Sequence, residues 1–210
     1  MLKTSSAQIL CRHLPYRCGR WTFCTSVSFF PDLVARLRQL TKKPFHVHLM
    51  VDSKVLLQQI DQFIKAGANL ITIWYENGDI VSTALDQIRK ANVSAGLSIG
   101  LETSPEVLVP YFDRIELVTM MGTRVGVKGQ DLSEEACDRM SSMRQLIQQH
   151  GYPQKIKLAA DGGNRSNTVP ALRSAGADTV VMGSLAYGSQ NLKETFDWLW
   201  SLPGPQLKII

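Results

Sequence analysis

The residues best suited to chemistry follow short apolar runs in the second half of the chain. Asp161 ends one such run and is followed at once by Gly162 and Gly163, so a carboxylate stands beside two backbones without side chains. Gly183 and Ser184 follow the next apolar run. Because glycine lets peptide N–H groups approach an anion closely, the two segments predict a carboxylate next to a phosphate site. An ordinary turn after Asp161 and a helix cap at Ser184 are the alternatives.

Two histidines lie in an earlier apolar run, which covers residues 45 to 51. The alternation of side chains along a strand places His46 and His48 on one face of it. Neutral imidazoles near a strand end suit a divalent metal ion, and a hydrogen-bonded core histidine is the alternative.

From residue 31 onward, amphipathic helical stretches alternate with short apolar runs. The pattern predicts helices over Pro31 to Leu40, Ser53 to Ala66, Asp79 to Ala91, Ser104 to Phe112, Ser133 to His150, Thr168 to Ala175 and Asn191 to Leu202. It predicts strands over Phe45 to Val51, Leu70 to Glu76, Ala95 to Leu101, Leu117 to Met121, Ile156 to Ala160 and Thr179 to Met182. Such alternation is typical of βα units around a parallel sheet.

The fold that fits this pattern is an α/β protein of the (β/α)8 TIM-barrel class, in one domain over residues 1–210. Six strands, a further candidate strand before Pro31 and seven helices fall about one unit short of eight. We therefore expect the first strand–helix unit and the second strand to be lacking or scrambled. A doubly wound sheet is the alternative, but no Gly-rich dinucleotide loop follows an early strand. In a barrel, the carboxyl ends of the strands form the active site.

Charge and composition narrow the class of protein. The net charge is +5, and Lys3, Arg12, Arg17 and Arg20 supply four of these charges within the first 30 residues, which contain no Asp or Glu. The remaining chain is nearly neutral, so we expect no nucleic-acid partner. No apolar run is long enough for a membrane span or a signal-peptide core, which favours a cytoplasmic protein.

The cysteines have the same uneven distribution as the charges. Cys11, Cys18 and Cys24 lie in the first 30 residues and Cys137 stands alone in the rest. With His13 they offer four zinc donors, but the tight C-x2-C spacing of common structural zinc sites is missing. We expect neither disulfides nor a zinc site there.

Several motifs together resemble the ribulose-phosphate 3-epimerases and the related allulose-phosphate epimerases. Val-His-Leu-Met-Val at 47–51 is similar to the family's third-strand motif, and Ala-Asp-Gly-Gly-Asn at 160–164 is similar to its seventh-strand motif. Ala-Gly-Ala-Asp at 175–178 with Val-Met-Gly-Ser at 181–184 resembles the family's last strand and turn. The resemblance covers about residues 28 to 200.

The resemblance implies a ketose-phosphate 3-epimerase of the ribulose-5-phosphate or allulose-6-phosphate type. In this family a divalent metal (zinc, iron or manganese), held by two histidines and two aspartates, polarises the ketose carbonyl, and the two aspartates exchange a proton on opposite faces of the substrate carbon. By motif match, His48 and Asp161 are metal ligands and Asp161 is also one acid/base. The matched substrate- and phosphate-binding residues are Met50, Gly126, Val127, Lys128, Gly129, Gln130, Gly162, Gly163, Gly183 and Ser184. The implied partner is a small sugar phosphate, with a homo-oligomer left open.

Three departures from the family pattern bear on activity. The loop Asn-Pro-Gly-Phe-Gly-Gly-Gln appears as Arg-Val-Gly-Val-Lys-Gly-Gln at 124–130, where Lys128 reaches a phosphate or simply solvates the loop. Trp74 stands where the family usually has a histidine, and Gly100 replaces an asparagine, so a preference for a different sugar is one alternative. Another phosphosugar-binding barrel enzyme and a catalytically inactive barrel protein are therefore the alternatives.

The largest departure is the absence of the second-strand motif H-x-D-x-x-D-G-H-F-V-P, which leaves two of the four expected metal ligands missing. Its ungapped place, residues 15–25, reads PYRCGRWTFCT, with Pro15 and Arg17 at the two ligand positions. With synonymous codons chosen freely and read one base later, this stretch spells HIDVADGHFVP. We therefore interpret residues 1–27 as an aberrant, out-of-frame segment, and a genuine but diverged N-terminus is the competing interpretation.

Overall fold

The computed structural model describes residues 7–12, 30–125, 129–204 and 208–209, of which 7–12 and 208–209 are described by their backbone. Contacts divide the described chain into two compact units, one up to Gly96 and the other from Leu97 onward. In each unit the strands run parallel and follow one another in chain order.

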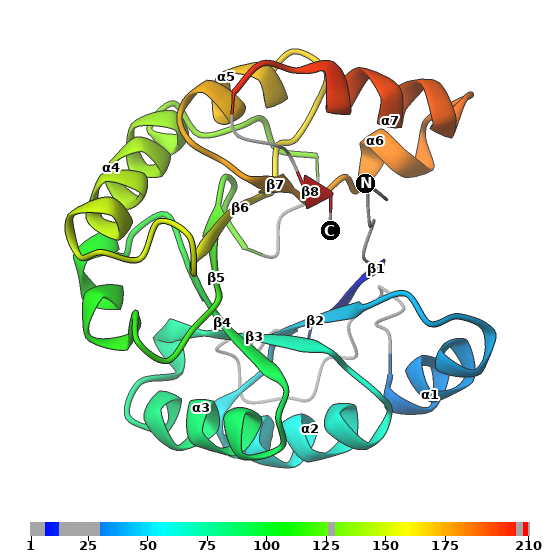
Figure 1. Ribbon diagram of the computed structural model, residues 1–210, viewed down its shortest axis with the longest axis vertical. Coiled ribbons are helices and arrows are strands. Elements are labelled where there is room, and N and C mark those ends of the chain that lie inside the picture. The colour runs from blue at the N-terminus through cyan, green and yellow to red at the C-terminus, as the bar shows by residue number, and fades with distance from the viewer. Residues whose placement is uncertain (1–6, 13–29, 126–128, 205–207, 210) are drawn as a thin grey trace. The chain divides into compact units, whose positions relative to one another are not determined.

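The first unit alternates strands and helices in the order β1 (Ala7–Arg12), α1 (Pro31–Leu40), β2 (Phe45–Met50), α2 (Ser53–Lys65), β3 (Leu70–Trp74), the short 3-10 helix η1 (Tyr75–Asn77) and α3 (Ile80–Lys90). The strand β4 (Ser94–Ile99) contains the boundary between the units. Helices α2 and α3 lie side by side against β2 and β3 (Figure 1).

The core of the first unit follows from the spacing of apolar residues. Leu56, Ile60 and Phe63 recur at helical spacing on α2 and are fully buried, while every residue of β2 is buried. A strand that is covered on both faces has a nearly continuous run of apolar residues instead of alternating apolar and polar residues, which is typical of parallel sheets. The Asp52 side chain accepts a hydrogen bond from Lys54 N and so caps the start of α2.

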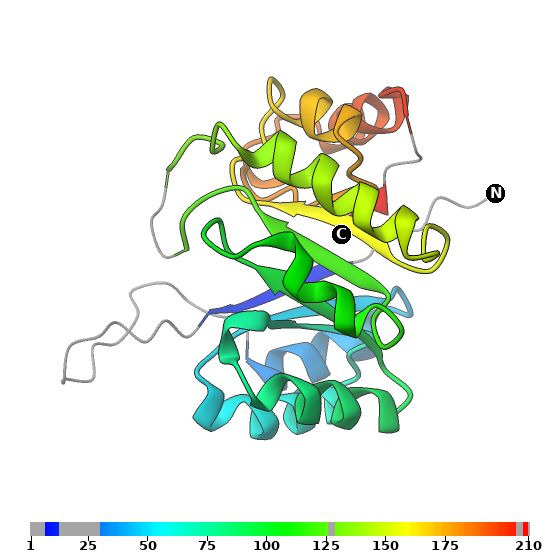
Figure 2. The same ribbon diagram turned by 90° about the vertical axis from the view of Figure 1, so that its left-hand side faces the viewer.

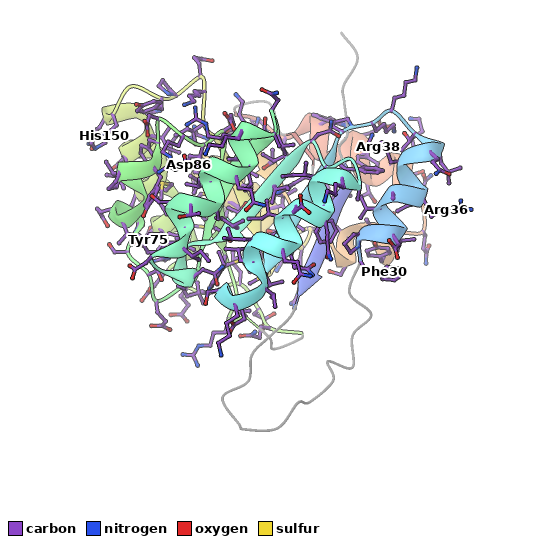
Figure 3. All side chains as sticks on the ribbon, turned by 90° about the horizontal axis from the view of Figure 1, so that it is seen from below. Phe30, Arg36, Arg38, Tyr75, Asp86 and His150 are labelled. Carbon is purple, nitrogen blue, oxygen red and sulfur yellow. The ribbon has the colours of Figure 1, made fainter. Side chains whose placement is uncertain are left out.

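Two arginines on α1 have different environments (Figure 3). Arg36 projects into solvent, whereas the Arg38 guanidinium lies 3.7 Å from the Phe45 ring centroid. Arg38 also donates to Lys43 O at 2.8 Å and to Asn69 Oδ1 at 2.9 Å. It therefore ties α1 to the starts of β2 and β3.

The second unit continues with the 3-10 helix η2 (Pro105–Tyr111), β5 (Leu117–Met121), α4 (Ala136–Gln149), β6 (Lys157–Asp161), α5 (Val169–Ser174), β7 (Thr179–Val180), α6 (Ser184–Tyr187), α7 (Leu192–Ser201) and β8 (Lys208–Ile209). Figure 2 shows α4 running along the β5–β6 strands, which it contacts. Among the described residues, no helix is long and apolar enough to cross a membrane.

The predicted elements agree with these bounds to within a few residues, with three corrections. The helix predicted over Ser104 to Phe112 is 3-10, because Pro110 lies inside it and lacks the N–H of an α-helix. The strand predicted over Leu70 to Glu76 ends at Trp74, where η1 begins. The third correction is β1, which the sequence did not predict; the candidate strand directly before Pro31 lies outside the described residues.

Candidate active site

Asp161 is the last residue of β6, and the residue is 3% exposed. Its backbone carbonyl accepts a hydrogen bond from Gly122 N at 2.7 Å, which continues the β5–β6 pairing by one step past Met121. The structure therefore places the predicted acid/base at the carboxyl end of a buried strand, as the sequence predicted.

The two glycines after Asp161 are packed against the loop that follows β5. Both have positive φ angles, of 95° at Gly162 and 69° at Gly163. A Cβ at Gly162 would lie 2.3 Å from Thr123 Oγ1, and a Cβ at Gly163 would lie 2.7 Å from Leu132 Cα. These glycines are required by backbone conformation and by close packing between two loops.

Gly183 and Gly129 have open surroundings instead. A Cβ at either position would meet no described atom within 4 Å, and both have positive φ angles, of 46° and 75°. Open space next to backbone N–H groups is what an anion site needs. Of the glycines predicted to face a phosphate, Gly162 and Gly163 are therefore enclosed by described neighbours, whereas Gly183 and Gly129 are not.

A shallow cavity of about 400 Å³ lies beside Ser184 in the second unit. Its lining combines hydroxyl groups with Trp198 and Glu194; the residues are Ser166, Ser184, Leu185, Gly188, Ser189, Glu194, Thr195 and Trp198. Ser184 was predicted from the sequence, whereas Ser166 was not, although it lies in the loop that follows Asp161. The hydroxyls of Ser166 and Ser184 give this cavity donors for a polar ligand.

Two further residues of the loop after Asp161 connect it to its neighbours. The Arg165 guanidinium forms an ion pair with Asp131 and donates to Gln130 O at 3.1 Å. The Asn164 side chain donates to Ala160 O and to Val181 O, each at 2.9 Å. Their position directly after the Asp-Gly-Gly run is the one sequence signal that could have identified them, and no signal indicates their partners.

The predicted histidines lie in the first unit, on β2. His46 and His48 are buried, and their rings are stacked with centroids 6.4 Å apart. His46 Nε2 lies 2.7 Å from Thr72 Oγ1, so this histidine has the hydrogen-bonded core role that was the alternative to metal binding. Burial, with a smaller contribution from the charge of His48, lowers the pKa of His46 well below its ordinary value, so its imidazole is neutral at pH 7.

The described donors do not fit a four-ligand metal site. Beside β2, the strand β1 aligns Gln8 with His46 and Leu10 with His48, so it brings neither imidazole nor carboxylate to this edge. No group of three or more His, Cys, Asp or Glu residues among the described positions has a geometry that could hold a metal. A catalytic zinc site usually has three protein ligands, which is more than the described positions bring together.

The predicted site residues are thus distributed over the two units. His48 and Met50 belong to the first, at the carboxyl end of β2. Asp161, Gly162, Gly163, Gly129, Gln130, Gly183 and Ser184 belong to the second. Gly126, Val127 and Lys128 lie outside the described residues.

Comparison with solved structures supports the fold class. A crystal structure of 3-hexulose-6-phosphate synthase matches with a TM-score of 0.59 at 16% identity, over 80% of this chain and 77% of that chain. At this identity the likeness shows the fold alone. The predicted (β/α)8-barrel fold class is confirmed in the form of a partial barrel.

Comparison with known sequences identifies the family. The chain is 29% identical to ribulose-phosphate 3-epimerase of Chlamydia muridarum over 82% of this chain and 75% of that protein. It is 27% identical to the Bacillus subtilis enzyme of the same name over 88% and 82%, and 30% identical to the Escherichia coli enzyme over 73% and 67%. The model of the ribulose-phosphate 3-epimerase family also matches residues 19 to 187, which is most of this chain. The chain therefore belongs to the ribulose-phosphate 3-epimerase family of isomerases.

Proposed function

We propose that this chain derives from a ketose-phosphate 3-epimerase and retains one half of the proton-transfer site. The observation that carries the proposal is the buried Asp161 carboxylate at the end of β6, which a glycine turn follows, in the same unit as the open Gly183–Ser184 turn. A carboxylate held near a bound sugar phosphate can remove a proton from the carbon next to a carbonyl.

The proposed substrate is a ketose phosphate of the ribulose-5-phosphate or allulose-6-phosphate type. The relatives are named for ribulose phosphate, and Gly183, Ser184 and Ser166 offer N–H and hydroxyl donors beside the cavity. In barrels of this class, the loops after the last two strands commonly bind the substrate phosphate. The proposed phosphate site lies in the loops after β6 and β7.

The proton donor for the second face of the substrate carbon is the part of the site that this chain lacks. Inversion at a carbon needs a proton donor on the face opposite Asp161, and the motif that supplies it in the family is replaced by residues including Pro15 and Arg17. Members of the family generally use a divalent metal. With Pro15 and Arg17 at two of the four ligand positions of the family motif, we expect metal binding much weaker than in an intact relative, and epimerisation to be slow or absent.

The test combines metal content with proton exchange at C3 of ribulose 5-phosphate in deuterated water. We expect the purified chain to carry far less than one metal ion per chain and to give inverted product slowly or not at all, with the Bacillus subtilis relative as the active control. Stoichiometric, chelator-resistant zinc, iron or manganese together with rapid inversion would contradict the proposed impairment. An aldol cleavage or decarboxylation of the sugar phosphate would favour another phosphosugar reaction.

A further inference from the structure

The pairing between the two strands that carry the proposed site is short. β7 has two residues, and its ladder with β6 consists of Ala159 opposite Thr179 and Ala160 opposite Val180. One more backbone hydrogen bond follows, from Val181 N to Ala160 O at 2.9 Å. At Gly183 the backbone turns to φ 46° and ψ −116°, which is incompatible with a continued strand.

Beyond the end of this ladder, the side chain of Asn164 connects the two segments by hydrogen bonds. Its Nδ2 donates to Ala160 O on β6 and to Val181 O, just past the end of β7, each at 2.9 Å, and the residue is 5% exposed. A primary amide has two N–H donors, and both are used here. The reversed amide orientation would place Oδ1 against two carbonyl oxygens, so the contacts themselves fix the orientation.

Both carbonyls that Asn164 binds lie next to the functional residues. Ala160 directly precedes Asp161, and Val181 stands two residues before Gly183. We propose that Asn164 is a positioning residue that sets the spacing between the Asp161 carboxylate and the phosphate-binding turn at Gly183 and Ser184. This inference rests on the proposed function, because the spacing matters only if one ligand engages both segments.

The spacing has a measurable consequence for binding. A sugar phosphate is held at its phosphate and at its sugar, so its affinity depends on the distance between the two segments, whereas inorganic phosphate engages the turn alone. Small misplacements of groups that engage one ligand together cost large factors. Loss of the Asn164 amide should therefore weaken ribulose 5-phosphate binding more than inorganic phosphate binding.

The experiment is calorimetric titration of the full chain and its variants with ribulose 5-phosphate and with inorganic phosphate. Asn164→Leu removes both hydrogen bonds and keeps the same branching of heavy atoms without adding charge, and Asn164→Ser keeps a single hydroxyl donor. Ile147→Val on α4 is the matched control, because it truncates a fully buried residue without touching either strand end. Thermal melts of each variant establish that the proteins compared are folded.

We expect the affinity ratio of ribulose 5-phosphate to inorganic phosphate to fall roughly tenfold in Asn164→Leu, to fall less in Asn164→Ser and to stay unchanged in Ile147→Val. A purely structural role would lower the melting temperature but leave this ratio unchanged in both Asn164 variants, and that result would overturn the inference. If Asn164→Leu does not fold, Asn164→Ser decides by the same ratio. If the unaltered chain binds neither ligand, the proposed function itself is wrong and this inference falls with it.

Discussion

At the scale of single residues, the glycines near Asp161 are of two kinds, and this difference can be measured. An added methyl group at Gly162 would collide with Thr123 and would also force a non-glycine residue to φ 95°. At Gly183 the methyl group would meet open space, although φ is 46° there. Packing therefore constrains the first glycine, and conformation alone constrains the second.

We predict that Gly162→Ala lowers the free energy of unfolding by about 2–5 kcal/mol, the sum of overpacking and backbone strain. Gly183→Ala should cost about 1 kcal/mol through strain alone, and it should weaken binding of inorganic phosphate because the methyl group fills the open turn. Urea denaturation and phosphate titration measure the two effects. Equal destabilisation by both changes would show that the packing of Gly162 against Thr123 is not significant.

His46 predicts a pH dependence of stability. Burial keeps it neutral in the folded chain, whereas the unfolded chain protonates it below about pH 6.5. Since the unfolded state then binds more protons, this contribution is fully present above pH 6.5 and is lost as the pH falls below it, by at most about 1.4 kcal/mol per pH unit.

The measurement is urea denaturation of the metal-free chain between pH 5 and pH 7.5, compared with His46→Gln. Glutamine can still reach Thr72 but does not titrate, so its stability should depend less steeply on pH. Parallel pH profiles for the two proteins would mean that His46 is not the residue responsible.

At the scale of elements, the side chain of Arg38 fixes α1 to the strands of the first unit. It stacks on Phe45 and donates to the carbonyl of Lys43 and to Asn69. Its aliphatic part also covers Gly67, where a Cβ would lie 3.0 Å from Arg38 Cγ. Arg36 lies on the same helix and is exposed, which makes it a matched control.

We predict that Arg38→Ala lowers the free energy of unfolding by about 1–3 kcal/mol, through lost cation–π contact and lost hydrogen bonds to the loop. Arg36→Ala should stay within about 0.5 kcal/mol of the unaltered chain. Urea denaturation of both variants in the same buffer measures these two changes in the free energy of unfolding. A similar loss from both would mean that α1 is held by its apolar face, at Val34, rather than by Arg38.

The elements also show how far the sequence could be interpreted. Regular apolar spacing predicted α1 and β5 with their observed bounds, because these segments have strong periodicity and clear ends. The four-residue α6 carries too few residues to show a period and was missed. The strand β1 was not placed, because Ala7–Arg12 combines apolar residues with a glutamine and an arginine and lies in a segment interpreted as foreign.

The candidate site also has a part that could be predicted from the local sequence and a part that depends on contacts between distant residues. The positions of Asp161, Gly183 and Ser184 just after apolar runs could be predicted, because they depend only on where strands end and helices begin. The packing of Gly163 against Leu132, and the bridging role of Asn164, join residues 17 to 31 positions apart in the chain. Spacing along one sequence carries no information about such contacts, so the sequence could not distinguish a packed glycine from an open one.

At the scale of the whole molecule, the first residues differ from the rest of the chain. Residues 1–30 hold four of the five net positive charges and three of the four cysteines. A one-base shift in the coding frame up to about Thr25 would explain this composition and would restore the second-strand motif together. We predict that the coding DNA, read one base later over residues 11–25, spells ADIYHIDVADGHFVP; any other reading means that the N-terminus is genuinely diverged.

The central claim is that the chain holds one half of an epimerase site and that the other half can be restored. The test protein is a chain in which residues 11–25 are replaced by ADIYHIDVADGHFVP, with the first strand–helix unit of the Bacillus subtilis relative placed upstream. The direct measurement is exchange of the C3 proton and inversion of ribulose 5-phosphate by this protein in deuterated water. We expect exchange with inversion, and we expect Asp161→Asn in this background to reduce turnover about 10²–10⁴-fold, since it removes one of the two acid/base groups. A restored chain that binds metal and sugar phosphate but never exchanges the C3 proton would contradict the account.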